Sequence, residues 1–222
     1  MENSHDLMTI SVLGGTGKEG KGLAYRWAKA GYRVLIGSRN PQKAISTAIE
    51  LTNFLGGKAC IEGVTNLTAA QQGDMVALAV PYPFHRETLE LIKDALIGKV
   101  LIDVTVPLVP PVVTRVQMPP AGSAAQEAHE ILGKEVQVTC AFQNISYDRL
   151  MNPGPVESDV LVTGTSKAAR LETLKLVAAA GFKGWDAGPI ENSVVVEGMT
   201  SVLIGINRQF GSTSAGIHII GV

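Results

Sequence analysis

Three glycines near the N-terminus have the spacing of a phosphate-binding turn. Gly15, Gly17 and Gly20 follow the pattern G-x-G-x-x-G between a β-branched run and a helical pattern. In this pattern the first glycine permits a tight turn, the second lets the backbone approach a pyrophosphate, and the third lets the helix pack close to the strand. The amides that begin such a helix also attract phosphate charge. The stretch therefore predicts a dinucleotide site with candidate contacts at Gly15, Thr16, Gly17, Lys18, Glu19 and Gly20.

The next expected strand ends without the acidic residue of an NAD site. An Asp or Glu there accepts hydrogen bonds from the ribose 2′-hydroxyl, and it would repel a 2′-phosphate. In this chain the stretch LIGSRN supplies Ser38 and Arg39, and Lys43 follows one helical turn later. A hydroxyl group and two cations are suited to a phosphate dianion. We therefore predict that the dinucleotide is NADP(H).

The carboxyl ends of the later strands carry few groups for acid–base chemistry, although ligands of doubly wound folds lie outside these ends. They offer mainly apolar rings, prolines and amides. His85 could touch a ligand, or it could be an ordinary histidine at a helix start. The candidate cofactor contacts here are Val80, Pro81, Tyr82, His85, Thr105, Pro107, Gln143, Asn144 and Ile145. The four histidines have no metal-ligand spacing, so we predict no metal site.

A site of this kind suits hydride transfer between two planar cofactors. Reduction of a ketone by NADPH usually needs a positioned proton donor, whereas a flat cofactor supplies its own electron sink. The protein then contributes the binding and orientation of the two rings. The C-terminal segment 191–211 is apolar almost all round, and its Gly198 and Gly205 permit close approach of a helix, a second subunit or a flat ligand. Met199 and Leu203 are its candidate contacts.

These residues lie on an alternating pattern of strands and helices. Apolar β-branched runs predict strands over residues 8–15, 32–37, 58–64, 74–81, 99–107 and 136–142. Helical spacing predicts helices over residues 18–31, 40–54, 84–98 and 123–133, with a short helix before the fourth strand. Later elements are strands over 159–164 and 183–188, a helix over 167–181 and the C-terminal helix. Such alternation indicates an α/β fold with a doubly wound (Rossmann) parallel sheet.

The order of these elements divides the chain into two parts. We expect an NADP-binding Rossmann domain over residues 1–143. A small C-terminal α/β domain would follow over residues 144–222 and end in the long apolar helix. The proline-rich stretch 107–123 is expected to be an irregular loop over the sheet edge.

Composition and charge argue against several classes of protein. The chain has 222 residues, 45% of them hydrophobic, and a net charge of −1 without a basic stripe, so we expect no nucleic-acid partner. The start, MENSHDLMTI, does not resemble a signal peptide, and the apolar runs are shorter than the ~18 residues of a membrane helix. Cys60 and Cys140 lie in apolar runs and are expected to be buried free thiols. Unpaired thiols indicate a reducing, cytoplasmic compartment.

Several stretches together carry a family resemblance that covers nearly the whole chain. They are VLGGTGKEGKGLA, GSRNPQKA, AVPYPFH, VPLVP, DAGPIENSVVVEGMT and RQFGSTSAGI. The first is shared with many dehydrogenases, but GGTG, GSR and DAGP followed by NS form a more specific combination. In these stretches the chain resembles the NADPH-dependent reductases of the deazaflavin coenzyme F420, the F420:NADP oxidoreductases.

The resemblance implies a homodimer of Rossmann subunits whose C-terminal part closes a deazaflavin pocket. It implies that NADP lies on the glycine loop with its 2′-phosphate near Thr16, Ser38, Arg39 and Lys43. The nicotinamide would reach Pro81 and the turn over 105–107. The deazaflavin would stack on it, between the stretch after the sixth strand and the last helix. Hydride would pass reversibly between nicotinamide C4 and deazaflavin C5.

One stretch departs from that family. Where the family has a histidine after the sixth strand, in a stretch of the type ALHTIP, this chain has Gln143 in AFQNIS. AFQNIS is closer to the AFNVIS of the reductase domain of membrane ferric reductases, which lies beside a flavin. Gln143 and Asn144 can still hydrogen-bond a ring carbonyl or nitrogen. The alternatives are therefore reduction of FMN, FAD or a small imine or carbonyl compound, or a non-catalytic role as an NADP(H) sensor.

Overall fold

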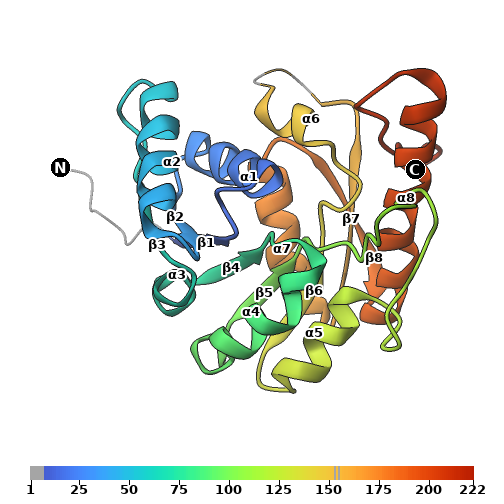
Figure 1. Cartoon of the computed structure of the whole chain (residues 1–222), viewed down its shortest axis with the longest axis horizontal. Coiled ribbons are helices and arrows are strands. Elements are labelled where there is room, and N and C mark those ends of the chain that lie inside the picture. Colours follow the sequence, from blue (N-terminus) through green and yellow to red (C-terminus); the bar gives the residue numbers. More distant parts are fainter. Residues whose placement is uncertain (1–7, 153, 155) are drawn as a thin grey trace.

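One eight-stranded sheet forms the centre of the described chain, which comprises residues 8–152, 154 and 156–222 of a computed structural model (Figure 1). The strands are β1 Thr9–Leu13, β2 Arg33–Ser38, β3 Ile61–Thr65, β4 Met75–Leu78, β5 Val100–Asp103, β6 Gln137–Cys140, β7 Asp159–Gly164 and β8 Lys183–Pro189. Their order across the sheet is β3-β2-β1-β4-β5-β6-β7-β8. Successive strands are added on one side of β1 up to β3 and on its other side from β4 onward, and this switch in strand order creates a ligand crevice at the carboxyl ends of β1 and β4. Residues 1–7, over which no signal peptide is expected, lie outside the described residues.

The pairing between β6 and β7 differs from every other pairing in the sheet. These two strands run antiparallel, whereas the other neighbours are parallel. They share two residue pairs, Thr139 with Gly164 and Cys140 with Thr163, while the other neighbours share four or more. β7 and β8 nevertheless continue the sheet that β1 to β6 begin. The division into domains at residue 143 stays a prediction.

Helices cover both faces of the sheet. They are α1 Lys18–Lys29, α2 Pro41–Phe54, α3 Asn66–Gln72, α4 His85–Ile92, α5 Ala124–Leu132, α6 Tyr147–Met151, α7 Lys167–Ala179 and α8 Ser193–Phe210. One face packs against α1, α2, α6 and α7, and the other against α3, α4, α5 and α8. Figure 1 shows α2 and α8 at opposite ends of the molecule. In the described residues, no helix combines the length and apolarity needed to cross a membrane.

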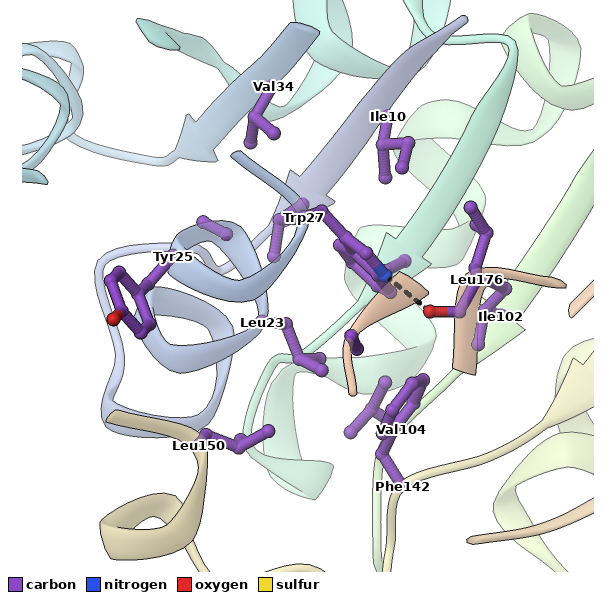
Figure 2. Packing of buried hydrophobic residues seen from close by; sticks show 14 of the residues in the cluster. Ile10, Leu23, Tyr25, Trp27, Val34, Ile102, Val104, Phe142, Leu150 and Leu176 are labelled. Atoms are coloured by element: carbon purple, nitrogen blue, oxygen red, sulfur yellow. Dashed lines mark hydrogen bonds between the residues drawn. The ribbon is translucent and has the colours of Figure 1, made fainter. Parts of the chain in front are cut away.

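Alternating side chains along the inner strands fill two separate cores. In β1, Ile10 and Val12 face the α1 side, whereas Leu13 faces the opposite side. The ring of Trp27 lies in the α1-side core, and its Nε1–H donates to the carbonyl oxygen of Leu176 in α7 at 2.9 Å (Figure 2). Because both faces are covered, the strands are apolar on both sides, as is usual for parallel strands.

The predicted α/β Rossmann fold is confirmed, and the predicted elements lie within a few residues of the observed ones. The sequence pattern missed α6, because five residues are too few to show a helical period. Cys140 is buried as predicted, but the prediction for Cys60 is wrong. Cys60 is exposed because it lies just before β3, the edge strand of the sheet.

Candidate cofactor-binding site

A cleft of about 840 Å³ lies at the carboxyl ends of the parallel strands. The predicted contacts on its wall are Thr16, Gly17, Lys18, Glu19, Ser38, Arg39, Lys43, Val80, Pro81, Thr105, Gln143, Asn144, Ile145 and Leu203. The remaining predicted contacts, all within the described chain, lie off the wall: Gly15, Gly20, Tyr82, His85, Pro107 and Met199. One cleft therefore brings together the glycine loop, the end of β2, the ends of β4 to β6 and helix α8.

The glycine loop makes its tight turn at Gly14. This residue has φ +72°, and a Cβ on it would lie 2.7 Å from the Ala79 carbonyl oxygen. Gly15 stands inside the same turn, as predicted, because the Gly17 N–H donates across it to the Gly14 carbonyl oxygen at 2.9 Å. The turn needs a glycine at this position, because a Cβ there would lie 2.7 Å from the Val12 carbonyl oxygen.

Gly17 and Gly20 have the surroundings that the motif predicts. A Cβ on Gly20 would lie 2.7 Å from the Gly14 carbonyl oxygen, so this glycine lets α1 approach the loop closely. At Gly17 the nearest described atom to a Cβ would be the same oxygen at 3.3 Å, and the residue lines the cleft. The first amides of α1 have no acceptor within the helix and are suited to a phosphate group.

Lys18 and Glu19 connect the start of α1 to α6. Lys18 Nζ donates to the Tyr147 hydroxyl at 3.2 Å and lies 4.3 Å from the centroid of that ring. Burial raises the pKa of Glu19 to about 7; a hydrogen bond from the Tyr147 backbone opposes this rise, and nearby Asp148 adds to it. Near neutral pH the carboxyl is therefore partly protonated, which reduces its repulsion of a phosphate on the loop.

Ser38, Arg39 and Lys43 form a cationic corner at the end of β2. Asn40 fixes this corner: its side-chain oxygen accepts from Lys43 N at 3.1 Å, and its backbone N–H donates to Ser38 Oγ at 3.1 Å. The side-chain bond also caps the N-terminus of α2. The Arg39 guanidinium lies over the ring of Phe84, 4.0 Å from its centroid. The corner thus offers one hydroxyl and two cations to a single anionic group.

Asp103 organises the ends of β4, β5 and β6 from behind the cleft wall. Its buried carboxylate accepts from Thr105 N at 2.9 Å and lies 2.7 Å from His85 Nε2, while its carbonyl oxygen accepts from Gln143 Nε2 at 2.6 Å. Burial disfavours a charge on His85, but the Asp103 carboxylate raises the pKa of this histidine above its ordinary value. His85 is fully buried and contacts Asp103, so the structure does not bring it to the cleft.

β6 ends in a left-handed turn at Phe142. This residue has φ +74°, a conformation that residues with side chains rarely adopt. Its ring packs edge-to-face against Trp27 and Phe182, with centroids 5.8 and 6.1 Å apart, and this packing supports the turn. The turn leads directly to Gln143 and Asn144 on the cleft wall. Such strained residues are concentrated at functional sites.

Helix α8 holds Gln143 and Asn144, the two residues that follow Phe142. Asn144 Nδ2 donates to the Val196 carbonyl oxygen at 2.9 Å, and the Gln143 carbonyl oxygen accepts from Thr200 Oγ1 at 2.9 Å. Among the described residues, the side-chain oxygens of Gln143 and Asn144 are buried without a hydrogen-bond partner. The hydrogen bonds to α8 therefore hold this part of the wall in place.

Helix α8 and the chain after it complete the cleft on the C-terminal side. Ile204, Asn207, Thr213 and Ala215 lie on the wall beside Leu203. Asn207 Oδ1 accepts from Ala215 N at 2.9 Å, which holds the C-terminal tail against α8. The tail thus forms part of the site.

Gly198 in α8 accommodates the proline-rich loop. A Cβ on it would lie 3.2 Å from Met118 Cε and 3.3 Å from Val116 Cγ1. Figure 1 shows this loop running beside α8. The close neighbour of the glycine is thus a segment of the same chain, and Met199 lies off the cleft wall.

Several wall residues were not predicted from the sequence. They are Gly14, Asn40, Asn66, Ala79, Phe84, Thr88, Val104, Val106, Leu108, Phe142, Ser146, Tyr147, Thr200, Ile204, Asn207, Thr213 and Ala215. Some of them are next in sequence to a predicted contact, and they could have been predicted from that position. The start of α6 and the C-terminal tail gave no such signal, because their place depends on packing between distant segments.

The chain is similar in sequence to several known proteins. Residues 9–107 match the family described as NADP oxidoreductase coenzyme F420-dependent. The chain is 37% identical over 220 residues to an F420-dependent NADP reductase of Methanocaldococcus jannaschii, covering 96% of this chain and 98% of that protein. It is also 37% identical to an F420-dependent NADP reductase of Methanothermobacter thermautotrophicus, covering 96% of this chain and 95% of that protein.

A solved structure shows the same fold. This crystal structure of an Arthrobacter protein has a TM-score of 0.78 and 23% identity, and the match covers 96% of this chain and 100% of that chain. The two F420-dependent NADP reductases named above each match nearly the whole of this chain at 37% identity. The chain therefore belongs to the family of F420-dependent NADP reductases.

Proposed function

We propose that this protein transfers a hydride reversibly between NADP(H) and the deazaflavin coenzyme F420. Family membership supports this reaction, and the cleft supports it independently. One end of the cleft carries the cationic corner, and another part of its wall is formed by Ile145 and Leu203. A single cleft with a charged and an apolar part suits a dinucleotide and a flat ring in contact. This continuity of the cleft is the observation that carries the proposal.

NADP(H) would extend from the cationic corner to the ends of β4 and β5. The corner would bind the 2′-phosphate, and the first amides of α1 beside Gly17 would bind the pyrophosphate. The nicotinamide would lie near Pro81 and Thr105, both of which line the cleft. Asp103 holds the Thr105 backbone in place from behind, so this part of the wall is fixed before the ligand binds.

The deazaflavin ring would stack on the nicotinamide, between Ile145 and the side chains of α8. Residues 144–222, which we propose as a small C-terminal domain, supply this side of the pocket. In the reaction a hydride leaves C4 of NADPH and bonds to C5 of the deazaflavin, and a proton from solvent balances the reduced ring. The protein contributes orientation, which alone can lower such a barrier by several kcal/mol, on the order of 7–11 in the best intramolecular cases.

Gln143 shapes the wall of the deazaflavin pocket in this proposal. Its Nε2 already donates to the Asp103 carbonyl oxygen at 2.6 Å, so that group is engaged within the protein. An amide does not titrate, and Gln143 would therefore orient the ring without exchanging a proton. Family membership does not favour the flavin, imine, carbonyl or sensor alternatives.

The proposal is tested by anaerobic mixing of the protein with NADPH and oxidised F420, following the visible absorbance of the deazaflavin. We expect bleaching that requires the protein and that NADH drives poorly. Arg39→Ala should weaken NADPH binding by about 10- to 150-fold and NADH binding much less, because it removes charge-assisted hydrogen bonds to the 2′-phosphate. Tight NADPH binding without bleaching, together with oxidation of NADPH by FMN or an imine, would refute the choice of F420.

We also propose that the protein is a cytoplasmic homodimer. Helix α8 exposes an apolar stripe of Val195, Val202, Ile206 and Phe210, which are 61%, 51%, 40% and 72% exposed. A second copy could cover this stripe about a two-fold axis. Light scattering should show that Val202→Lys yields a monomer, whereas Phe54→Lys, at an exposed position on α2, leaves the dimer intact.

The unpaired thiols support the proposed cytoplasmic location, because free cysteines are usual in a reducing compartment.

A further inference from the structure

We propose that Phe84 is a specificity-determining residue for the dinucleotide. Its ring holds the Arg39 guanidinium at the cationic corner and thereby raises the preference for NADP(H) over NAD(H). This inference rests on the proposed function, because it takes the cationic corner to be the 2′-phosphate site. Phe84 follows β4, so it lies outside the β2–α2 turn in which the sequence pattern places this preference.

The contact between Arg39 and Phe84 is close. The central guanidinium carbon lies 4.0 Å from the ring centroid, well within the roughly 6 Å at which a cation and a ring attract each other. Both residues line the cleft. Along the part of the chain that the structure describes, Arg39 makes no hydrogen bond or ion pair. The ring is therefore the contact that orients this side chain.

The backbone of Phe84 is itself fixed. Phe84 ends the 3₁₀ turn Tyr82–Phe84, and its N–H donates to the Pro81 carbonyl oxygen at 2.9 Å. Its carbonyl oxygen accepts from the Thr88 hydroxyl at 2.7 Å. These bonds involve the main chain, so a change of the Phe84 side chain leaves them in place. The ring is thus a fixed support that can be altered by itself.

A guanidinium supported in this way is prepared for a phosphate. Its N–H donors lie in its own plane, so an aromatic ring beneath the plane leaves them free. A freely rotating arginine loses rotamer entropy when it binds, and the ring removes part of that loss beforehand. The benefit reaches NADP(H) alone, because NAD(H) has a hydroxyl group where NADP(H) has the phosphate.

A different role for Phe84 predicts a different result. If the ring served only as cleft wall beside the adenine or ribose, its loss would weaken the binding of both dinucleotides alike. In that case apolar volume would be the property that matters, and leucine would replace Phe84 about as well as tyrosine. The ratio of the two affinities separates these roles.

The test compares the dissociation constants of NADPH and NADH for the intact chain and four variants: Phe84→Leu, Phe84→Tyr, Arg39→Ala and the double variant Arg39→Ala/Phe84→Leu. We expect Phe84→Leu to weaken NADPH binding by about 3- to 10-fold while NADH binding changes less than about 2-fold. Phe84→Tyr keeps an aromatic face and should bind both dinucleotides nearly as the original chain does. In the Arg39→Ala background, Phe84→Leu should produce no further loss of NADPH preference.

Three results from the variants would overturn the inference. They are equal weakening of NADPH and NADH binding by Phe84→Leu, equal effects of Phe84→Leu and Phe84→Tyr, or an undiminished effect of Phe84→Leu in the Arg39→Ala background. F420 reduction at saturating NADPH serves as the separate control. An original chain that prefers NADPH but does not reduce F420 would contradict the proposed reaction while leaving the role of Phe84 intact. An original chain without preference for NADPH would refute both the 2′-phosphate site and Phe84 as its support.

Discussion

Gly15 and Gly17 stand two residues apart in the same loop, yet they are glycines for different reasons. A Cβ at position 15 would collide with the Val12 carbonyl oxygen, whereas at position 17 it would project into space next to the cleft. The backbone of Gly17, with φ −76° and ψ 166°, is one that valine adopts readily. A substitution at Gly17 therefore affects the ligand, and a substitution at Gly15 affects the fold.

We expect Gly17→Val to fold normally and to lose binding of both NADPH and NADH. The valine side chain would occupy the place of the pyrophosphate, and the loss should be on the order of 100-fold or more. Calorimetric titration with both dinucleotides measures it, and the melting temperature of the variant reports its fold. Gly15→Ala is the matched control and should lower the melting temperature instead. Unchanged NADPH affinity in folded Gly17→Val would show that the pyrophosphate lies elsewhere.

Single residues near a motif could be predicted from the sequence, and residues that depend on distant contacts could not. The types and spacing of Ser38, Arg39 and Lys43 are by themselves enough to indicate a cationic site. Phe84 gave no such signal, because its role arises from a contact with Arg39 across 45 positions of sequence. The prediction of His85 as a cofactor contact failed for the same reason, because its partner Asp103 lies on a neighbouring strand.

The short helix α6 depends on a side chain from another part of the chain. Arg26 of α1 is buried and donates from Nε to the Leu150 carbonyl oxygen and from Nη2 to that of Arg149, both at 2.7 Å. These carbonyl groups lie near the end of α6, where no further helical turn can satisfy them. α6 begins with Tyr147, a residue of the cleft wall, so Arg26 supports the site through this helix.

We expect Arg26→Met to lower the free energy of unfolding by about 2–4 kcal/mol. Methionine fills similar space but leaves several buried carbonyl groups without donors. Urea titration measures the loss. Arg33→Met is the matched control: it removes an exposed ion pair with Glu62 and should cost less than about 1 kcal/mol. Equal losses in the two variants would show that the buried bonds add nothing to stability.

Long elements were predictable because their periodic patterns persist over many residues. Helix α8 could be predicted from its apolar run, whereas the segments that pack against it could not. The orientation of β7 could not be derived from its own residues, because an inner strand has a similar apolar pattern whether its neighbour runs parallel or antiparallel to it. The path of the preceding segment decides that orientation.

Glu197 joins α8 to the core on the face of the sheet opposite α1. Its carboxylate is fully buried and accepts from the backbone N–H groups of Ala124 and Ala125 at 2.7 and 3.0 Å. Burial raises the pKa of Glu197 to about 8; Asp103 adds to the rise, and the two N–H groups oppose it. A carboxyl that holds its proton so strongly links the stability of the fold to pH.

We expect this carboxyl to reduce stability as the pH rises from about 4.5 to about 8. Below that range it is protonated in the folded and the unfolded chain, so its contribution is fully present. Within the range the unfolded chain releases the proton and the folded chain retains it, which costs up to about 1.4 kcal/mol per pH unit. In urea titrations between about pH 5.5 and pH 8, the free energy of unfolding should decline less for Glu197→Gln than for the original chain. Glu191→Gln changes an exposed residue and should show the same decline as the original chain. Parallel pH profiles for all three chains would contradict the assignment.

The two residue pairs between β6 and β7 have a consequence for hydrogen exchange. Few backbone bonds join the last two strands to the rest of the sheet, so amides of β7 and β8 should open together at a lower free energy than those of β1, β2 and β4. The cleft has walls on both sides of this pairing, from Gly17 to Leu203. Bound ligands that contact both sides would suppress the opening by mass action. Deuterium uptake in residues 159–189 should then fall as the cleft fills, although these strands hold none of the residues proposed to bind the phosphates.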